Sequence, residues 1–337
     1  MAILVISSNT VASKLSTDKR PGLKLAEALQ QAGIFTLFDV PSYFYRNSTF
    51  GNLIIIFSYL RIALQIIRPS REEIFFYNAP VAYSLLYWFA LFSRLRRPSL
   101  LLADGVNCYG MKWNPLLFLR MYRRVITLPM NHDIANILSK SSNFIWLPGI
   151  CNVGGFTRNN LIVDNKAIKL LYNSALLANN GPEVILDFAI KNDWCEVVVT
   201  ETEDNFLNYL SSELKRTEIL IPTNLQFLGV LSSVEYLQLL NVVDGILLCR
   251  DERHFQNKFN FPSKFVEALH LGLPVISLFA ISYVPSILYH NCASVNLSSL
   301  NFPDILHQHG SDEFKEERNY FLGLCDTLRL QTWLKLA

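Results

Sequence analysis

The sequence predicts an α/β protein made of two doubly wound halves, each with helices packed on a parallel sheet. Short apolar runs alternate with helical patterns over most of the chain, which is typical of β-α-β units. A length of 337 residues also exceeds what one hydrophobic core usually supports. The composition agrees, because 51% hydrophobic and only 17% charged residues can fill two large cores and argue against disorder.

The first half opens with a well-marked β-α-β unit. Pro21-Gly22 followed by LKLAEALQQAG gives a helix start and an amphipathic body, and Gly33 gives the stop. The strands of this half are expected at Ile3–Ser7, Ile34–Phe38, Ile74–Tyr77, Leu100–Ala103, Val125–Thr127 and Phe144–Leu147.

The domain boundary is expected where the pattern changes after Pro148, in the polar segment GICNVGGFTRNNLIVDNK. This gives an N-terminal domain at 1–150, a linker at 151–165 and a C-terminal domain at 166–310. The remainder, 311–337, is expected to form a long amphipathic helix that packs back on the N-terminal domain. In the C-terminal domain, strands are expected at Lys169–Tyr172, Glu196–Val199, Leu225–Phe227, Gly245–Cys249 and Pro274–Ser277, and helices at Pro182–Lys191, Asn205–Lys215, Ser233–Leu240 and Ser263–Leu271.

Charge and cysteine usage exclude several classes of protein. A net charge of +2 is too slight for nucleic-acid binding, which needs a concentrated basic face. The six cysteines form no CxxC pair, so we expect reduced thiols in a cytoplasmic protein. The opening MAILVISSN lacks the basic leader of a signal peptide and is interpreted as a buried strand.

Three apolar and basic segments lie in the N-terminal half, at residues 53–67, 81–97 and 111–124. The first falls short of the roughly 20 residues that span a bilayer and carries Arg61 in its middle. Each segment taken alone fits a core helix with a charged end. Together they also fit peripheral attachment to an anionic inner membrane leaflet, and both interpretations stay open.

The segment FNFPSKFVEALHLGLPVIS, which begins at Phe259, carries the most chemistry. Pro262 and Ser263 start a helix, and Lys264 and Glu267 share one face of its first turns. A helix N-terminus beside a lysine suits a diphosphate, and a carboxylate one turn deeper can accept hydrogen bonds from a ribose diol. The alternative is a capped surface helix with a local Lys264–Glu267 pair worth about 0.2–0.5 kcal/mol.

This segment resembles the donor-site signature of glycosyltransferase family 4 and its neighbours in the GT-B fold, in which a proline, a small polar residue, Lys and Glu lie in a helix that closes on a Gly-x-Pro-Val strand. Three further stretches resemble the family in the same chain order: IWLPGICNVGGF from Ile145, LLYNSALLANNGPEVILDFAI from Leu170 and FLGVLSSVEYLQLLNVVDGILLC from Phe227. The resemblance implies two Rossmann-like domains facing a cleft. It also implies transfer of a sugar from a nucleoside-diphosphate sugar to a hydroxyl, with retention of anomeric configuration.

The resemblance further implies the residues of the donor site. The donor would contact residues of the C-terminal half, namely Ser174, Asn180, Gly181, Gly229, Arg250, Ser263, Lys264 and Glu267. Lys264 and the helix N-terminus would stabilise the leaving diphosphate. The sequence holds no Asp-x-Asp pair, so we expect no metal requirement and no cofactor besides the donor substrate.

The sequence departs from the family pattern at three places. Phe259 stands where many members carry a glutamate that meets the donor sugar. The loop NSALLANNG lacks the arginine or lysine that commonly follows the first strand of the C-terminal domain. The strand that ends at Thr200 continues as ETED instead of a glycine; its Glu201 and Glu203 fit a solvated acidic turn better than a metal site.

On the acceptor side, Asp104 follows an expected strand and is a candidate to orient or deprotonate the acceptor hydroxyl. A turn-capping role explains this aspartate equally well. His132 and Asp133, after another strand, and His254, in RDERHF, are weaker catalytic candidates.

A glycan or lipid-linked acceptor in surface polysaccharide assembly would explain the apolar, basic N-terminal half. Two competing hypotheses stay open. One is a non-catalytic scaffold or partner subunit that kept the GT-B fold, and the other is a sugar-nucleotide epimerase on the same fold.

Overall fold

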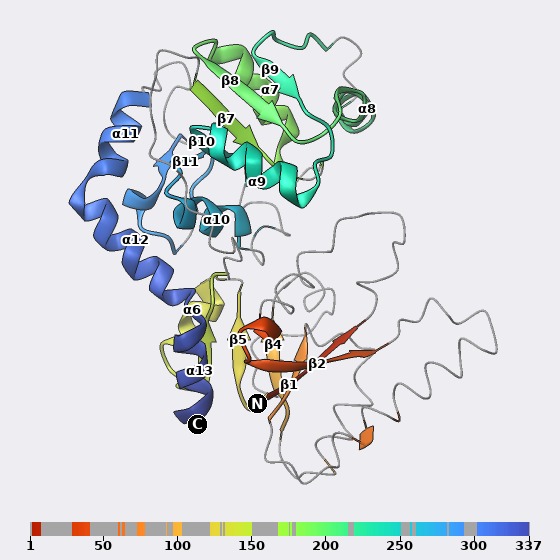
Figure 1. The fold of residues 1–337 in the computed structure, drawn as a ribbon, viewed down its shortest axis with the longest axis vertical. Coiled ribbons are helices and arrows are strands. Elements are labelled where there is room, and N and C mark those ends of the chain that lie inside the picture. The colour runs from red at the N-terminus through yellow and green to blue at the C-terminus, as the bar shows by residue number, and fades with distance from the viewer. Residues whose placement is uncertain are drawn as a thin grey trace, which may run out of the picture. The chain divides into compact units, whose positions relative to one another are not determined.

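The computed structural model describes residues 2–7, 29–40, 60, 63–64, 73–77, 92, 97–102, 122–128, 130, 132–149, 168–174, 176, 180–214, 219–250, 257, 261–281, 283–292 and 302–336. The chain forms two compact units, each an α/β body on a parallel sheet (Figure 1). Unit 1 comprises Met1–Asn152, Phe259–Phe261 and Leu324–Ala337, and unit 2 comprises Val153–Lys258 and Pro262–Gly323. The expected linker at 151–165 lies outside the described residues.

The sheet of unit 1 has six parallel strands in the order β2-β1-β3-β4-β5-β6. The strands are β1 (Ala2–Ser7), β2 (Phe35–Val40), β3 (Ile74–Tyr77), β4 (Ser99–Leu102), β5 (Val125–Thr127) and β6 (Phe144–Trp146), with α6 (His132–Leu138) between the last two. All six expected strands are confirmed, and the largest shift is at the end of β2, which reaches Val40 instead of Phe38. These strands could be predicted because a parallel sheet is covered on both faces, so its strands are continuous apolar runs.

The helix expected after Pro21 falls mostly outside the described residues, which begin again at Leu29. Gly33 ends the helix in the left-handed region, with φ 69°, and the Ile34 amide donates to the Leu29 carbonyl at 3.0 Å. The turn feeds Phe35 into β2, where its ring meets Phe75 edge-on at 5.1 Å. The predicted stop at Gly33 is therefore confirmed.

The last helix, α13 (Thr327–Leu336), is part of unit 1. Leu330 is fully buried in the core of this unit. Gln331 Nε2 donates to the Ala32 carbonyl at 2.8 Å, and Arg329 Nη1 donates to the Trp146 carbonyl at 3.1 Å. The C-terminal helix therefore completes the packing of the first half of the chain.

A buried ion pair lies at the amino ends of the strands of unit 1. Arg124 Nη1 donates to Glu73 Oε2 at 2.9 Å and to the Leu334 carbonyl of α13 at 3.1 Å. The Ser99 hydroxyl donates to the other oxygen of Glu73. Burial lowers the pKa of Arg124, and the guanidinium lies 5.0 Å from the Trp333 ring centroid. These contacts attach the end of α13 to the sheet.

The sheet of unit 2 is also parallel, with the order β12-β11-β10-β7-β8-β9. Its strands are β7 (Ile168–Tyr172), β8 (Cys195–Val199), β9 (Leu225–Phe227), β10 (Gly245–Leu248), β11 (Val275–Ser277) and β12 (His290–Asn291). Its helices are α7 (Pro182–Lys191), α8 (Glu203–Leu214), α9 (Ser233–Val242), α10 (Ser263–Leu271), the short 3-10 helix η6 (Ser286–Leu288), α11 (Phe302–Gly310) and α12 (Asp312–Leu324). The bounds expected for β9, α7 and α10 are confirmed at both ends; η6, β12 and α11 were not expected.

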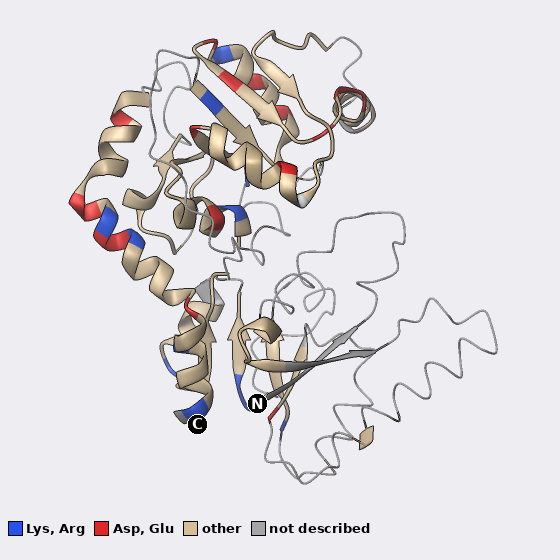
Figure 2. Cartoon of the chain, viewed as in Figure 1, with Lys and Arg blue, Asp and Glu red and all other residues tan. Residues whose placement is uncertain are grey.

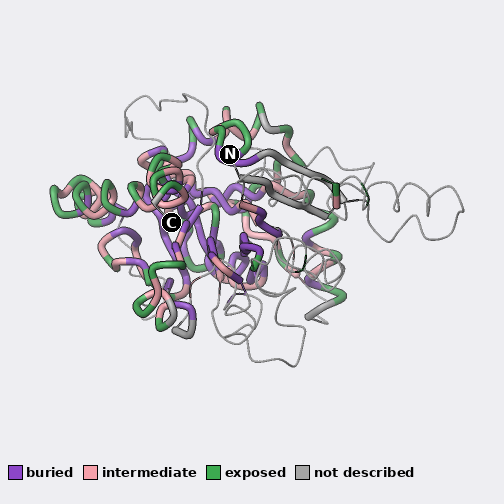
Figure 3. Tube along the Cα trace, turned by 90° about the horizontal axis from the view of Figure 1, so that it is seen from below, coloured by how far each residue is buried: buried purple, intermediate pink, exposed green. Residues whose placement is uncertain are grey.

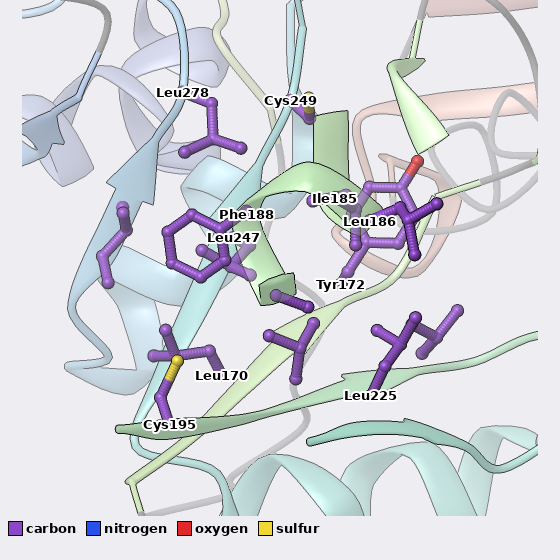
Figure 4. Close-up of a cluster of buried hydrophobic side chains, with 14 of the residues drawn as sticks. Leu170, Tyr172, Ile185, Leu186, Phe188, Cys195, Leu225, Leu247, Cys249 and Leu278 are labelled. Carbon is purple, nitrogen blue, oxygen red and sulfur yellow. The ribbon is translucent and has the colours of Figure 1, made fainter. Parts of the chain in front are cut away.

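The core of unit 2 forms where the central strands meet α7 (Figure 4). Ile185, Leu186 and Phe188 of α7 are buried against Leu170 and Tyr172 of β7. The middle of each sheet is buried, whereas the helices alternate buried and exposed positions along their length (Figure 3). Burial of this kind stabilises each large apolar side chain by about 1.5–3 kcal/mol.

Two helices, α12 and α13, occupy the stretch where one long helix was expected, and they are separated at Cys325-Asp326. Acidic and basic residues alternate along α12 (Figure 2). From this helix Arg318 Nε donates to the Leu269 carbonyl at 2.5 Å, and its Nη2 donates to the His270 carbonyl at 3.1 Å. A cation at the last carbonyls of α10 suits the negative end of the helix dipole, so α12 fixes the end of α10.

Within the described residues, no helix is both long and apolar enough to cross a membrane. The expected membrane-facing segments at 53–67, 81–97 and 111–124 lie almost wholly outside these residues. Of the positions described there, Leu60 is 55% exposed, Leu64 57% and Phe92 71%.

Candidate functional site

The candidate site lies at the carboxyl edge of the unit 2 sheet, where the strand order reverses. β7 has β8 on one side and β10 on the other, so chain connections leave it in opposite directions. Ligands of doubly wound sheets bind outside the carboxyl ends of the strands at such a point. We therefore expect ligand contacts at the residues that follow β7 and β10.

Among the described residues of the loop after β7, Asn173 and Asn180 accept hydrogen bonds that attach the loop to its neighbours. The Thr200 hydroxyl at the end of β8 donates to Asn173 Oδ1 at 2.9 Å. The Tyr172 hydroxyl donates to the Asn180 carbonyl at 2.9 Å, which fixes the last turn of the loop against the strand. Burial, the largest cause, raises the pKa of Tyr172 well above its ordinary value, so the phenol stays protonated and keeps donating.

Gly181 makes the turn that starts α7. It has φ 58°, in the left-handed region, and an added Cβ would lie 2.6 Å from Cys249 Sγ. The Cys249 thiol in turn donates to the Gly181 carbonyl at 3.4 Å. Glycine is required here by both conformation and space, and the contact joins the loop after β7 to the end of β10 at the switch point.

The Ser263 and Lys264 amides are the ones that the start of α10 can offer to a ligand, because the Phe265 amide donates to the Pro262 carbonyl at 2.9 Å. The start of α7 offers fewer, because Pro182 has no amide hydrogen and the Val184 amide donates to the Gly181 carbonyl at 3.0 Å. Neither α7 nor α10 has a side-chain N-cap hydrogen bond. They differ in charge, however. The first turn of α7 holds Glu183, whereas the first turn of α10 holds no acidic residue and contains Lys264. A helix N-terminus carries partial positive charge, so α10 is the more favourable of the two for an anion.

Lys264 and Glu267 form a compact cluster with Tyr236 of α9. Lys264 Nζ donates to Glu267 Oε2 at 2.8 Å and to the Tyr236 hydroxyl at 3.1 Å. The Tyr236 hydroxyl donates to the same Glu267 oxygen at 2.8 Å. The side chains of Lys264 and Glu267 remain 30% and 24% exposed, so a ligand can reach both.

The predicted shared face of Lys264 and Glu267 is thus present, and the two residues pair with each other. This is also the geometry that the surface-pair alternative expects. The pair is partly exposed, so it contributes little to stability by itself. Its position at the N-terminus of α10 favours a binding role.

The other sequence-predicted donor residues are spread along the same edge. Ser174 follows β7, Asn180 is buried before α7, Arg250 follows β10, and Ser263 is the exposed first residue of α10. Gly229 follows β9, the outermost strand on that side, and has φ 75°. The structure therefore brings Asn180, Gly181 and the end of β10 together, and places Gly229 two strands from β7.

Several candidates are not tested by the geometry. Asp104, His254 and Phe259 lie outside the described residues. His132 is the first residue of α6, with Asp133 next in the same helix. Their catalytic roles stay predictions.

The ETED segment, residues 201–204, forms a turn and the start of α8. Glu201 Oε1 accepts hydrogen bonds from the Thr202 amide and from Asn205 Nδ2, both at 3.0 Å, and Glu203 begins α8. Throughout the described part of the chain, no three His, Cys, Asp or Glu side chains are grouped as metal ligands would be. The acidic-turn interpretation of Glu201 and Glu203 fits these contacts.

Tyr236 is the site residue that sequence reasoning missed. It lies within the helix expected at Ser233–Leu240, but nothing in the sequence links it to residues 28 and 31 positions further on. A partial signal exists, because Ser232 and Glu235 have the spacing of a capping box, and the structure contains it. That motif fixes where α9 begins but not which helix its side chains meet.

The sequence matches no protein-family model and no curated protein, but its fold is similar to solved structures. The chain is similar to sucrose-phosphate synthase from Thermosynechococcus elongatus, with TM-score 0.62 and 12% identity over 100% of this chain and 98% of the other. It is similar to HepE from Anabaena in complex with UDP, with TM-score 0.60 and 14% identity over 99% and 98% of the two chains. A lipopolysaccharide outer core galactosyltransferase, WaaB, gives TM-score 0.55 and 13% identity over 99% and 100%.

These similarities extend over nearly the whole of each chain and establish the fold. The predicted two-unit α/β architecture of the GT-B type is confirmed.

Proposed function

We propose that this protein is a glycosyltransferase that moves a sugar from a nucleoside-diphosphate sugar to a hydroxyl group. One observation carries the proposal: Lys264 lies in the first turn of α10, a helix that starts at the carboxyl edge of the unit 2 sheet and has no acidic residue in that turn. The shared fold adds support, because HepE was crystallised with UDP and WaaB is named a galactosyltransferase.

The diphosphate would bind to α10 and the turn before α7. Lys264 supplies a full positive charge, and the Ser263 and Lys264 amides at the start of α10 supply donors aligned with the helix dipole. The backbone of Asn180 and Gly181, fixed by Tyr172 and Cys249, offers a second group of amides. Arg250, directly after Cys249, completes the proposed set.

Glu267 would bind the ribose. It lies one helical turn after Lys264, and its Oε2 is the oxygen that accepts from Lys264 and Tyr236. The other carboxylate oxygen is then available to ribose hydroxyls. A charged acceptor strengthens such hydrogen bonds to about twice the neutral value.

In the proposed reaction the bond between the anomeric carbon and the diphosphate oxygen breaks, and the acceptor oxygen bonds to that carbon on the same face. The acceptor proton moves to the departing diphosphate, so the configuration is retained. Lys264 and the α10 amides stabilise the charge that develops on the leaving phosphate, which is where fixed donors lower the barrier most. Asp104 is the proposed residue for orienting the acceptor hydroxyl.

Metal independence belongs to the same proposal. The lysine, the helix dipole and backbone amides together offset the diphosphate charge, which is the role a divalent cation takes in other sites.

The proposed acceptor is a glycan or a lipid-linked glycan in surface polysaccharide assembly, reached by peripheral contact with an anionic membrane. Support comes from the apolar and basic residues of the three N-terminal segments, apart from Tyr122 and Arg124, which are buried in unit 1, and from the exposure of Leu60, Leu64 and Phe92. Exposed apolar side chains beside cations suit the boundary between headgroups and acyl chains.

The direct test offers UDP-, GDP- and dTDP-sugars, with EDTA present and with or without lipid-linked oligosaccharide acceptors, and measures released nucleoside diphosphate. A glycosyltransferase releases diphosphate from one donor, and Lys264→Ala abolishes most of that release. A scaffold releases none from any donor, and an epimerase produces an isomeric nucleotide sugar without acceptor. Either of the last two outcomes contradicts the proposed activity.

A further inference from the structure

Tyr236 contacts both residues of the proposed donor site through one hydroxyl group. That hydroxyl accepts from Lys264 Nζ at 3.1 Å and donates to Glu267 Oε2 at 2.8 Å. Its ring also lies under the ammonium group, with Lys264 Nζ 4.2 Å from the ring centroid. The phenol therefore has separate polar and aromatic contacts within the cluster.

The position of Tyr236 is set by the start of α9. The Ser232 hydroxyl accepts from the Glu235 amide at 3.3 Å, and the Glu235 carboxylate accepts from the Ser232 amide at 2.8 Å. Tyr236 follows directly, and Leu240, one turn later, is fully buried. The capped first turn and the buried anchor hold the phenol in place relative to α10.

Ligand binding would change the partners of Glu267 in a defined way. Glu267 Oε2 accepts two hydrogen bonds, one from Lys264 and one from Tyr236. If Lys264 turns toward a diphosphate, Oε2 loses that donor. The Tyr236 hydroxyl still donates to Oε2, so the carboxylate keeps its orientation.

We propose that Tyr236 is a positioning residue: it holds the Glu267 carboxylate in place for the ribose while the Lys264 ammonium group turns from Glu267 to the diphosphate. The inference rests on the proposed function. The hydroxyl acts through Glu267 on ribose hydroxyls, and the ring guides the Lys264 ammonium. Tyr236 itself does not touch the ligand.

The test compares Tyr236→Phe with the unaltered protein by isothermal titration. The ligands are whichever of UDP, GDP and ADP the unaltered protein binds most tightly, and its 2′,3′-dideoxy analogue. Phenylalanine keeps the ring but removes the hydroxyl, so affinity for the ribonucleotide should fall roughly 5- to 15-fold, the scale of one hydrogen bond. Affinity for the dideoxy analogue should change less than about 2-fold, because no ribose hydroxyl remains for Glu267 to bind.

Two further variants separate the functions of the side chain. Tyr236→Leu removes ring and hydroxyl together and should weaken binding of both ligands, since no ring then guides the Lys264 ammonium toward the diphosphate. Tyr320→Phe is the matched control, because Tyr320 is 67% exposed on α12, and it should leave both affinities unchanged.

Equal losses for the ribonucleotide and the dideoxy analogue in Tyr236→Phe would overturn the positioning role, and so would no loss for either. If the unaltered protein binds none of these three diphosphates and does not bind dTDP either, the proposed function fails and this role fails with it. The selectivity is measured within one variant, so a general loss of stability cannot imitate it.

Discussion

Gly181 and Cys249 meet where the strand order of unit 2 reverses, and Cys249 leaves no space for a side chain at position 181. An added Cβ would lie 2.6 Å from Cys249 Sγ and 3.3 Å from the Cys249 carbonyl oxygen. The contact joins the turn before α7 to the end of β10. The backbone amides proposed to meet the diphosphate are fixed by this contact and by the Tyr172 hydroxyl bond to Asn180.

Gly181→Ala should therefore lower the free energy of unfolding by about 2–4 kcal/mol, from left-handed backbone strain plus overpacking. Gly272→Ala is the matched control, because Gly272 has φ 67° but, among the described residues, its added Cβ would meet Arg318 Nη2 alone, at 3.8 Å. That variant should lose about 1–2 kcal/mol. Urea unfolding measures both, and equal losses would show that the Cys249 contact adds nothing.

Glu267→Gln should weaken ribonucleotide binding by roughly 1–3 kcal/mol, because an amide is a poorer acceptor than a carboxylate. A 2′-deoxyribonucleotide already lacks one partner hydroxyl and should lose less. A double-mutant cycle over residue 267 and the 2′-hydroxyl measures the coupling energy. A coupling energy of zero would mean that Glu267 only pairs with Lys264 and Tyr236.

The buried thiols should make stability fall at alkaline pH. Burial raises the pKa of Cys195, Cys292 and Cys325 from 9.0 to about 12. The contribution of these protonated thiols to the free energy of unfolding is complete below pH 9. It is lost as pH rises toward 12, because the thiols of the unfolded chain ionise first. Each thiol lowers the free energy of unfolding by up to about 1.4 kcal/mol per pH unit in that window.

Cys292→Ala isolates one of these thiols, whose raised pKa has burial as its cause. Urea unfolding between pH 8 and about 10.5 should show a shallower decline for the variant than for the unaltered protein. Other titrating groups contribute equally to both proteins, so the difference in slope belongs to this thiol. Identical slopes would show that the Cys292 thiol ionises as readily in the folded protein as in the unfolded chain.

Membrane contact through the apolar and basic N-terminal segments should be electrostatic in part. The protein should co-sediment with vesicles containing phosphatidylglycerol and be released as salt rises, because charge attraction is screened beyond about 8 Å at physiological ionic strength. Vesicles of phosphatidylcholine alone should bind less. Equal recovery with both lipids at all salt concentrations would contradict the electrostatic contribution.

Most strands and helices were predictable because their signals are local. Pro182 after Gly181 marks the start of α7, and Gly272 marks the end of α10, so both helices agree with expectation at each end. The break between α12 and α13 was missed, although Asp326 carries a signal: its side chain accepts from the Leu328 amide at 2.8 Å. An amphipathic period continues through such a break and conceals it.

The site was predictable only in part. Lys264 and Glu267 are three residues apart in one helix, so their shared face follows from helix geometry. Tyr236 reaches them from α9, and Cys249 reaches Gly181 from β10, and such contacts depend on how the elements pack. Packing partners distant in sequence leave no periodic signal.

Titration of the protein with UDP, GDP, ADP and dTDP and with their nucleosides tests the proposed donor site most directly. One diphosphate should bind saturably with EDTA present, and Lys264→Ala should weaken it by about 1.5–3 kcal/mol while the nucleoside loses little. Lys315→Ala is the matched control, since Lys315 pairs with Asp312 at 2.9 Å in the same i,i+3 arrangement on α12, and it should bind normally. Equal losses for diphosphate and nucleoside in Lys264→Ala, or no binding to the unaltered protein, would contradict a diphosphate site at the start of α10.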